Sequence, residues 1–295
     1  MFGILTDDAA LARADLADAT YYLAEGVDGT RREPLPDAIN SVACWGDTAA
    51  VRDRPDRAAV TADGVRAVPA TEGHHWATVC PTDSDYRDGV LERLEQVGRV
   101  GDVRLTTLGF PGDGFCRCGR CRQQFGASDH DDWTDWRTDV VTSFVADAAA
   151  RVDGRLTATL YPDPYPNHLR ERAGLDPQAL AQHVDEFLVP LCSIGYETTY
   201  WVESLARGFA TELEGLEPSL SVQVSAPEAD VERLTGLSRQ VAPHVDRIVY
   251  GTHPDDVDVI TETIDRVRDA LESDEQGGNS DAGSTAAADA ARVSN

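Results

Sequence analysis

Short apolar runs alternate with longer amphipathic stretches along most of this chain. The apolar runs have the length and the β-branched content of buried strands, and the stretches between them have the periodicity of helices. The expected strands are 2–5, 39–45, 103–110, 156–161, 187–192, 220–224 and 247–250, with a weaker one at 29–32. The expected helices are 8–25, 84–97, 131–152, 176–184, 199–213, 228–241 and 255–272. This alternation predicts a parallel α/β fold.

Seven or eight strands with intervening helices predict a single-domain (β/α)8 barrel of the TIM type, either complete or lacking a strand. A doubly wound open sheet is the alternative. The barrel is expected to span residues 1–272, interrupted at 46–80 by a long loop excursion that lies over one barrel mouth. Residues 273–295 are mostly Ser, Gly, Asp and Ala, which predicts a disordered acidic tail.

Acidic residues are spread over every expected helix. The chain has 52 Asp and Glu against 26 Arg, contains no Lys, and carries a formal net charge of -26. Self-repulsion on this scale destabilises a fold at low salt, and molar salt screens it. We therefore expect a halophilic protein, with an ordinary acidic protein that has a disordered tail as the alternative. The charge argues against nucleic-acid binding, which needs a basic face.

The N-terminal segment has no recognisable signal peptide, and no apolar stretch approaches the ~20 residues that cross a membrane. We expect a cytoplasmic protein without a membrane partner. Thiols in that compartment stay reduced, which favours metal binding over disulfides. The sequence leaves the oligomeric state open.

Three of the six cysteines form a C-x-C-x-x-C run at Cys116, Cys118 and Cys121. That spacing allows several thiolates to converge on one zinc ion, and the fourth ligand must come from elsewhere in the chain. Cys80 is the leading candidate, and His74 or His75 could replace it.

Four thiolates around zinc leave no open position for water, so such a zinc would be structural and would fix loops. The alternative is that these cysteines are reduced and bind no metal. Cys44 and Cys192 lie inside strand-like runs and are expected to be small core residues.

Further short motifs lie in a fixed order between residues 55 and 125. They are Ala62-Asp63-Gly64, His75, Cys80-Pro81-Thr82-Asp83-Ser84-Asp85-Tyr86-Arg87, Gly109-Phe110-Pro111-Gly112, and the cysteine run followed by Phe125. In this order they resemble the catalytic barrel of family-42 glycoside hydrolases, the β-galactosidases, and of related glycosidase-like barrels. The resemblance covers about a quarter of the chain. It implies a carbohydrate ligand and a zinc ion held by Cys80, Cys116, Cys118 and Cys121.

The chain departs from that family at the catalytic acid. The family's strand before the cysteine loop ends in Asn-Glu-Phe, and its Glu is the general acid/base. Aligned on Phe110, this chain has Leu108 and Gly109 at the first two positions, and Thr106 or Thr107 where other glycosidase-like barrels carry an Asp. Glycoside cleavage normally needs two carboxylates about 5–9.5 Å apart.

Other acidic and aromatic residues follow expected strands, where barrel enzymes keep their active sites. Asp163 lies in a loop that also holds Tyr161, Tyr165 and His168. Planar aromatic surfaces beside hydrogen-bonding side chains suit a sugar, and a proline-stiffened loop is the alternative role.

Glu197, beside Tyr196, follows the next strand and is the second candidate acid; its alternative role is to cap the following helix. Asp163 and Glu197 are thus the candidate catalytic pair. Asp113 follows an earlier strand and could also be a simple turn residue. Further candidates for substrate binding at strand ends are Trp45, Tyr250 and His253.

These features support three functions. The first is a glycoside hydrolase-like barrel that acts on or binds carbohydrate, with structural zinc and relocated carboxylates. The second is a catalytically inactive barrel that binds a saccharide or a small metabolite. The third is an unrelated TIM-barrel enzyme of small-molecule metabolism, because fold resemblance alone does not assign a reaction.

Overall fold

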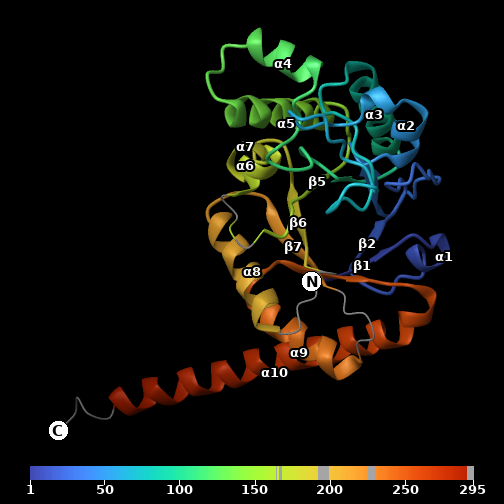
Figure 1. Ribbon diagram of the computed structural model, residues 1–295. Coiled ribbons are helices and arrows are strands. Elements are labelled where there is room, and N and C mark those ends of the chain that lie inside the picture. The colour runs from blue at the N-terminus through green and yellow to red at the C-terminus, as the bar shows by residue number, and fades with distance from the viewer. Residues whose placement is uncertain (164, 166–167, 192–198, 225–229, 291–295) are drawn as a thin grey trace.

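Eight parallel strands close into a barrel (Figure 1). The computed structural model describes residues 1–163, 165, 168–191, 199–224 and 230–290. Each strand pairs with its successor in the sequence, and the last pairs with the first. The predicted (β/α)8 barrel is therefore confirmed, and the open sheet is excluded. The strands are β1 (Phe2–Thr6), β2 (Ala19–Tyr22), β3 (Ile39–Ala43), β4 (Val103–Thr106), β5 (Leu156–Thr159), β6 (Glu186–Pro190), β7 (Ser219–Val224) and β8 (Arg247–Gly251).

Helices follow the strands and form the outer layer. Several begin at an aspartate whose carboxylate accepts a backbone amide of the first turn, as Asp83 does from Tyr86 at 3.1 Å and Asp132 from Thr134 at 2.7 Å. The helices are α1 (Ala9–Ala12), α2 (Thr48–Asp53), α3 (Ser84–Gly98), α4 (Gly119–Gly126), α5 (Trp133–Ala149), α6 (His168–Ala173), α7 (Pro177–Leu180), α8 (Thr199–Glu212), α9 (Val231–Val241) and α10 (Val257–Ala290).

The segment between β1 and β3 differs from expectation. The predicted helix over 8–25 and the predicted strand over 29–32 are both wrong, because this segment forms the single turn α1 and then β2. Asp15 has a φ of 52°, a left-handed conformation that a continuing helix does not adopt. In β2, Thr20, Tyr21 and Tyr22 are β-branched or aromatic residues that favour a strand.

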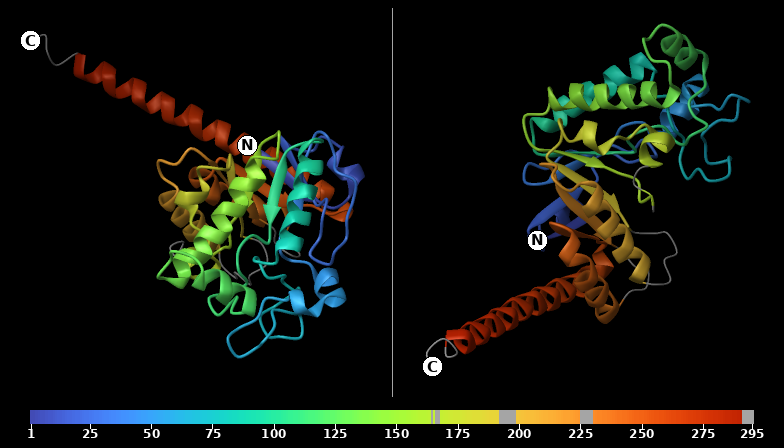
Figure 2. Two further views of the ribbon diagram at one scale, coloured as in Figure 1. Left: turned by 90° about the horizontal axis from the view of Figure 1, so that it is seen from above. Right: turned by 90° about the vertical axis from the view of Figure 1, so that its left-hand side faces the viewer.

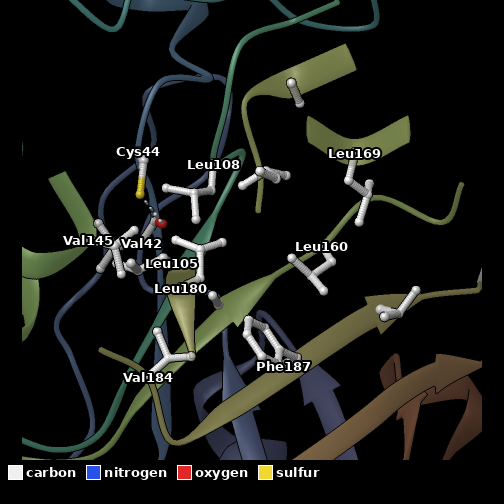
Figure 3. Packing of buried hydrophobic residues seen from close by; sticks show 14 of the residues in the cluster. Val42, Cys44, Leu105, Leu108, Val145, Leu160, Leu169, Leu180, Val184 and Phe187 are labelled. Atoms are coloured by element: carbon white, nitrogen blue, oxygen red, sulfur yellow. Dashed lines mark hydrogen bonds between the residues drawn. The ribbon is translucent and has the colours of Figure 1, made fainter. Parts of the chain in front are cut away.

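The main hydrophobic core lies between the barrel and its helices. Figure 3 shows this layer where β3 to β6 and the ends of these strands face α5 and α7; the residues labelled there include Val42, Leu105, Leu160, Phe187, Val145 and Leu180. Cys44 lies in the same layer with 0% exposure, which confirms its expected place as a small core residue. Burial raises the pKa of its thiol. Cys192 lies outside the described residues.

The inside of the barrel is closed at its N-terminal end by a polar network centred on Glu186. Its carboxylate accepts hydrogen bonds from Tyr21 at 2.6 Å, Arg247 at 2.8 Å, Thr157 at 3.1 Å and the hydroxyl of Ser221. Burial and the neighbouring Glu186 raise the pKa of Tyr21. Branched apolar residues usually fill this position in TIM barrels. Here a hydrogen-bonded ionic network fills it instead.

The excursion over 46–80 contains α2 and the 3₁₀ turn η1 (Pro55–Arg57), and antiparallel bridges join Gly46 to Thr78 and Ala58 to Val79. In the right-hand view of Figure 2, this excursion lies on the side of the barrel opposite the chain's N-terminus. The strands run from the N-terminal side towards it. The excursion therefore lies at the C-terminal mouth.

The C-terminal part of the chain continues α10 beyond the barrel. The first turns of α10 pack against α9, and the rest projects away from the barrel (Figure 1). Residues 273–290, for which we expected disorder, are the distal part of this helix. Across the described residues, every helix is too short or too polar to span a membrane.

Candidate metal centre and barrel mouth

Four cysteine sulfurs lie together at the C-terminal mouth of the barrel. Cys116, Cys118 and Cys121 come from the loop after β4 and the start of α4, and Cys80 precedes α3. Their four Sγ atoms all lie within 4.8 Å of one another. Cys80, Cys116 and Cys121 are buried, and Cys118 is half-buried. The structure thus joins the cysteine run to the end of the 46–80 excursion.

Local hydrogen bonds hold the sulfurs in this arrangement. Cys118 caps α4, and its sulfur accepts the amide of Cys121 at 3.4 Å. The sulfur of Cys116 accepts the amide of Val60 at 3.3 Å, and the amide of Arg117 donates to the carbonyl of Val60 at 2.7 Å. The middle of the excursion is therefore bonded directly to the cysteine loop.

The donor set fits a single tetrahedral metal ion. Sulfurs about 2.3 Å from a zinc ion lie about 3.8 Å from one another in a tetrahedron. The Sγ atom of Cys80 lies 3.6 Å from that of Cys118 and 3.4 Å from that of Cys121. Hydrogen bonds among the thiols lower the pKa of Cys118 and raise the pKa of Cys121, so in the absence of a metal the negative charge is placed on Cys118. These four residues could hold a metal ion with little rearrangement.

The histidines of the excursion stand apart from this group. The ring of His74 packs edge-on against Phe115 with centroids 5.4 Å apart, and His75 is exposed beside Trp76. The metal-ligand group found among the described residues consists of the four cysteines alone. Cys80 is thus the fourth member of the group, as expected from the sequence.

Position 109, just after β4, has no room for a catalytic acid. Gly109, at the position of the family-42 Glu, has a φ of 97°, and a Cβ there would lie 2.8 Å from the carbonyl oxygen of Ala173. Leu108 is buried in the core. Thr107 has a φ of 49°, and its hydroxyl accepts the amide of Gly46 at 3.0 Å. Glycine is therefore required by the backbone at this strand end.

Asp163 follows β5 and is the centre of a small polar cluster. Its side chain is 7% exposed and accepts hydrogen bonds from the amide of Tyr165 at 2.9 Å and from Arg172 at 3.3 Å. The imidazole of His168 lies 3.9 Å from the same carboxylate, and its ring packs on that of Tyr165 with centroids 5.0 Å apart. Tyr161 is half-buried against the core, and burial raises its pKa to about 12. The structure thus brings four sequence-predicted residues together.

The second acid, Glu197, and its neighbour Tyr196 lie outside the described residues. Tyr200 and Trp201, at the start of α8, are 63% and 52% exposed, and Tyr165 is 64% exposed. Tyr165 follows β5, and the helix that begins with Tyr200 and Trp201 is the next one after the adjacent strand β6.

The remaining predicted residues lie elsewhere. Trp45 is fully buried and packs on Phe144 of α5 with centroids 4.7 Å apart. Tyr250 is also fully buried, and its hydroxyl is 2.7 Å from that of Ser238 in α9, so it faces the helix layer. Burial raises its pKa to about 12. These two aromatic side chains do not reach the solvent.

Two exposed candidates have local roles in the backbone. Asp113 bonds the amide of Gly114 at 2.8 Å, which is the behaviour of a turn residue. His253 caps the 3₁₀ turn η3 (Pro254–Asp256) after β8. Both are exposed at the C-terminal side of the barrel.

Sequence reasoning missed Arg137, a buried arginine of α5. Its guanidinium donates to the carbonyls of Gly112, Asp113, Glu171 and Arg172 at 2.7–3.3 Å. It therefore ties the loop after β4 to α6 at the mouth. Burial lowers its pKa to about 10, so it remains charged at neutral pH. The sequence does hold one sign of this residue's role, because the arginine directly follows Trp136 on an otherwise apolar face of the helix.

Among the comparisons with known proteins, the one with solved structures supports the fold. No family model matches the chain, and no curated protein gives a significant match. Among solved structures, the glycoside hydrolase domain of PgaB (BpsB) from Bordetella bronchiseptica is similar, with a TM-score of 0.67 and 12% identity over 88% of this chain and 98% of that one.

A second similar structure is α-L-fucosidase isoenzyme 2 from Paenibacillus thiaminolyticus. The TM-score is 0.63 at 13% identity, over 93% of this chain and 49% of the fucosidase, so the chain spans about half of that protein. At such identities the likeness is one of fold. The chain has the (β/α)8 barrel fold that these glycoside hydrolase structures share.

Proposed function

We propose that this protein is a glycoside hydrolase-like barrel that binds a saccharide at its C-terminal mouth. The observation that carries the proposal is the exposed ring of Tyr165, which packs on His168 beside the carboxylate of Asp163. Large exposed aromatic side chains cost free energy in water, and sugar rings stack on such surfaces. Tyr165 and Asp163 follow the C-terminal end of β5, and barrels bind their ligands at this end of their strands.

Asp163 is the acid best placed to meet a sugar in this mouth. Its carboxylate holds the backbone of Tyr165 and pairs with Arg172, so it positions the Tyr165 ring. Arg172 and His168 have side chains that are 60% and 54% exposed, and each can donate hydrogen bonds to sugar hydroxyls. Catalysis by Asp163 together with Glu197 is part of the proposal.

A non-catalytic saccharide-binding barrel is the second candidate. Gly109 favours it, because the backbone excludes a side chain at the position of the family-42 acid. The two candidates differ in the number of carboxylates that they need. Hydrolysis requires a second carboxylate within about 10 Å of the first, whereas binding does not.

We further propose that the metal is zinc and that its role is structural. Cys80, Cys116, Cys118 and Cys121 would hold it, and a set of four thiolates leaves no position for a reacting water. Bound there, zinc would cross-link the excursion to the loop after β4. The protein's working environment in this proposal is molar salt within the cytoplasm.

A thermal-shift screen tests the saccharide proposal. The protein is melted in molar salt with a panel of mono- and oligosaccharides, because a ligand that binds only the folded state raises the melting temperature. At least one saccharide is expected to raise it, and Tyr165→Ala is expected to reduce that shift. A panel without any shift counts against both candidates. Appearance of a cleaved product favours the hydrolase over the binding protein.

A further inference from the structure

Trp76, near the end of the excursion, is a large aromatic residue that belongs neither to the cysteine group nor to the Asp163 cluster. It is half-buried. Unlike Trp45, Trp133 and Trp136, it lies outside the hydrophobic clusters formed by the described residues. An indole that does not contribute to the core and remains accessible to solvent is available to a ligand.

The position of the Trp76 ring is fixed at the strand ends. An added Cβ on Gly46 would lie 3.0 Å from the Trp76 Nε1 atom and 2.8 Å from the Thr107 Cγ2 atom, so the edge of the indole lies over Gly46, close to Thr107. Gly46 follows β3, and Thr107 follows β4. Trp76 therefore lies at the C-terminal ends of β3 and β4.

Backbone bonds hold this residue from its C-terminal side. The neighbouring Ala77 receives a hydrogen bond on its carbonyl from the amide of Asp47 at 2.9 Å and donates its amide to Thr48 at 3.1 Å. The excursion is also bonded at Val60 to the cysteine loop. These bonds fix the backbone next to Trp76, which lowers the cost of ordering this segment around a ligand.

The order of the strands gives the separation between Trp76 and the Asp163 cluster. Strands β3, β4 and β5 are consecutive in the barrel, with Ala43 paired to Thr106 and Leu105 paired to Ala158. Two strand spacings amount to about 10 Å. An oligosaccharide can bridge that span, whereas a single sugar unit bound at the Asp163 cluster does not reach it.

We propose that Trp76 forms a second stacking subsite for an oligosaccharide, at the ends of β3 and β4 and to one side of Tyr165, which follows β5. This inference rests on the proposed saccharide function. It deepens that function because it assigns the ligand class as an oligosaccharide rather than a monosaccharide. It also gives the metal-tethered excursion a role in recognition.

The test compares ligand lengths. Dissociation constants are measured in molar salt for chito-, cello- and galacto-oligosaccharides, from disaccharide to hexasaccharide, with the wild type, Trp76→Ala and Trp76→Phe. In the series that binds, Trp76→Ala is expected to weaken the longest ligand by about five- to tenfold, with the disaccharide nearly unaffected. Trp76→Phe keeps a ring and is expected to restore most of the affinity.

The outcomes separate the subsite from the proposed function. Equal affinities of the wild type and Trp76→Ala at every length overturn the subsite, and the saccharide function stands if Tyr165→Ala still weakens binding. A uniform loss at all lengths also overturns it, because a local subsite cannot affect a ligand too short to reach it. If the wild type binds none of these oligosaccharides at any length, both proposals fall. Metal content and melting temperature of each variant report whether the excursion has kept its structure.

Discussion

The sulfur atoms of Cys80 and Cys121 lie 3.4 Å apart although the two residues are 41 positions apart in the chain. One belongs to the end of a long excursion, and the other to the helix after β4. The contact brings the excursion, with Trp76 near its end, to the mouth of the barrel. The same contact completes a set of four thiols that fits one metal ion.

Cys118→Ser is expected to release the metal and to lower the melting temperature by roughly 5–10 °C, because binding free energy at a structural site is also folding free energy. Elemental analysis of the purified protein measures the metal content. Cys44→Ala is the matched control: Cys44 is equally free but lies in the core, so this variant is expected to keep its metal. Equal metal content in the wild type and Cys118→Ser contradicts the site.

Gly109→Ala is expected to destabilise the protein by about 2 kcal/mol, because the added Cβ meets the Ala173 carbonyl in a left-handed backbone. Gly208→Ala is the control. Gly208 lies inside α8 with no atom near its missing Cβ, so alanine there is expected to stabilise by about 1 kcal/mol. Denaturant unfolding measures both. A neutral Gly109→Ala would mean that this strand end can carry a side chain.

Glu186→Gln is expected to lower the free energy of unfolding by about 3–5 kcal/mol, because it leaves Arg247 buried without its partner carboxylate. Glu262→Gln breaks an exposed pair with Arg266 and is expected to change stability by less than about 1 kcal/mol. Both values come from denaturant melts in the same buffer. Similar costs for the two variants would show that the barrel network is not needed for folding.

The melting temperature is expected to rise as salt increases from about 0.1 M to the molar range. The cause is the net charge of -26, whose self-repulsion is screened over shorter distances as ionic strength increases. Differential scanning calorimetry across a series of KCl concentrations measures this dependence. A melting temperature that is highest at low salt would contradict the halophilic interpretation.

Local patterns predicted most of the fold. Seven strands lie where apolar runs indicated them, because each run is buried against helices and must be apolar on that face. Strand β2 was missed because Leu and Ala residues before it mimic a helix, and only the positive φ of Asp15 ends that pattern. The spacing of Cys116, Cys118 and Cys121 was informative because zinc chemistry restricts it strongly.

Long-range pairings were not predictable in the same way. Tyr21 and Arg247 form a hydrogen bond at 2.7 Å across 226 positions, and nothing near either residue indicates the other. Trp45 follows a strand, which suggested the mouth, but its ring turns outward onto Phe144. Tyr250 likewise packs towards α9. Such orientations depend on tertiary packing rather than on a local pattern.

Isothermal titration measures saccharide binding at the mouth without relying on a change in stability. An oligosaccharide chosen from the thermal-shift panel is titrated in molar salt into the wild type, Tyr165→Ala and Asp163→Asn. We predict a saturable isotherm for the wild type and affinities at least about fivefold lower for both variants, since one loses the stacking ring and the other the charge that positions it. A wild type without saturable heat, or variants that bind as tightly as the wild type, would contradict the account.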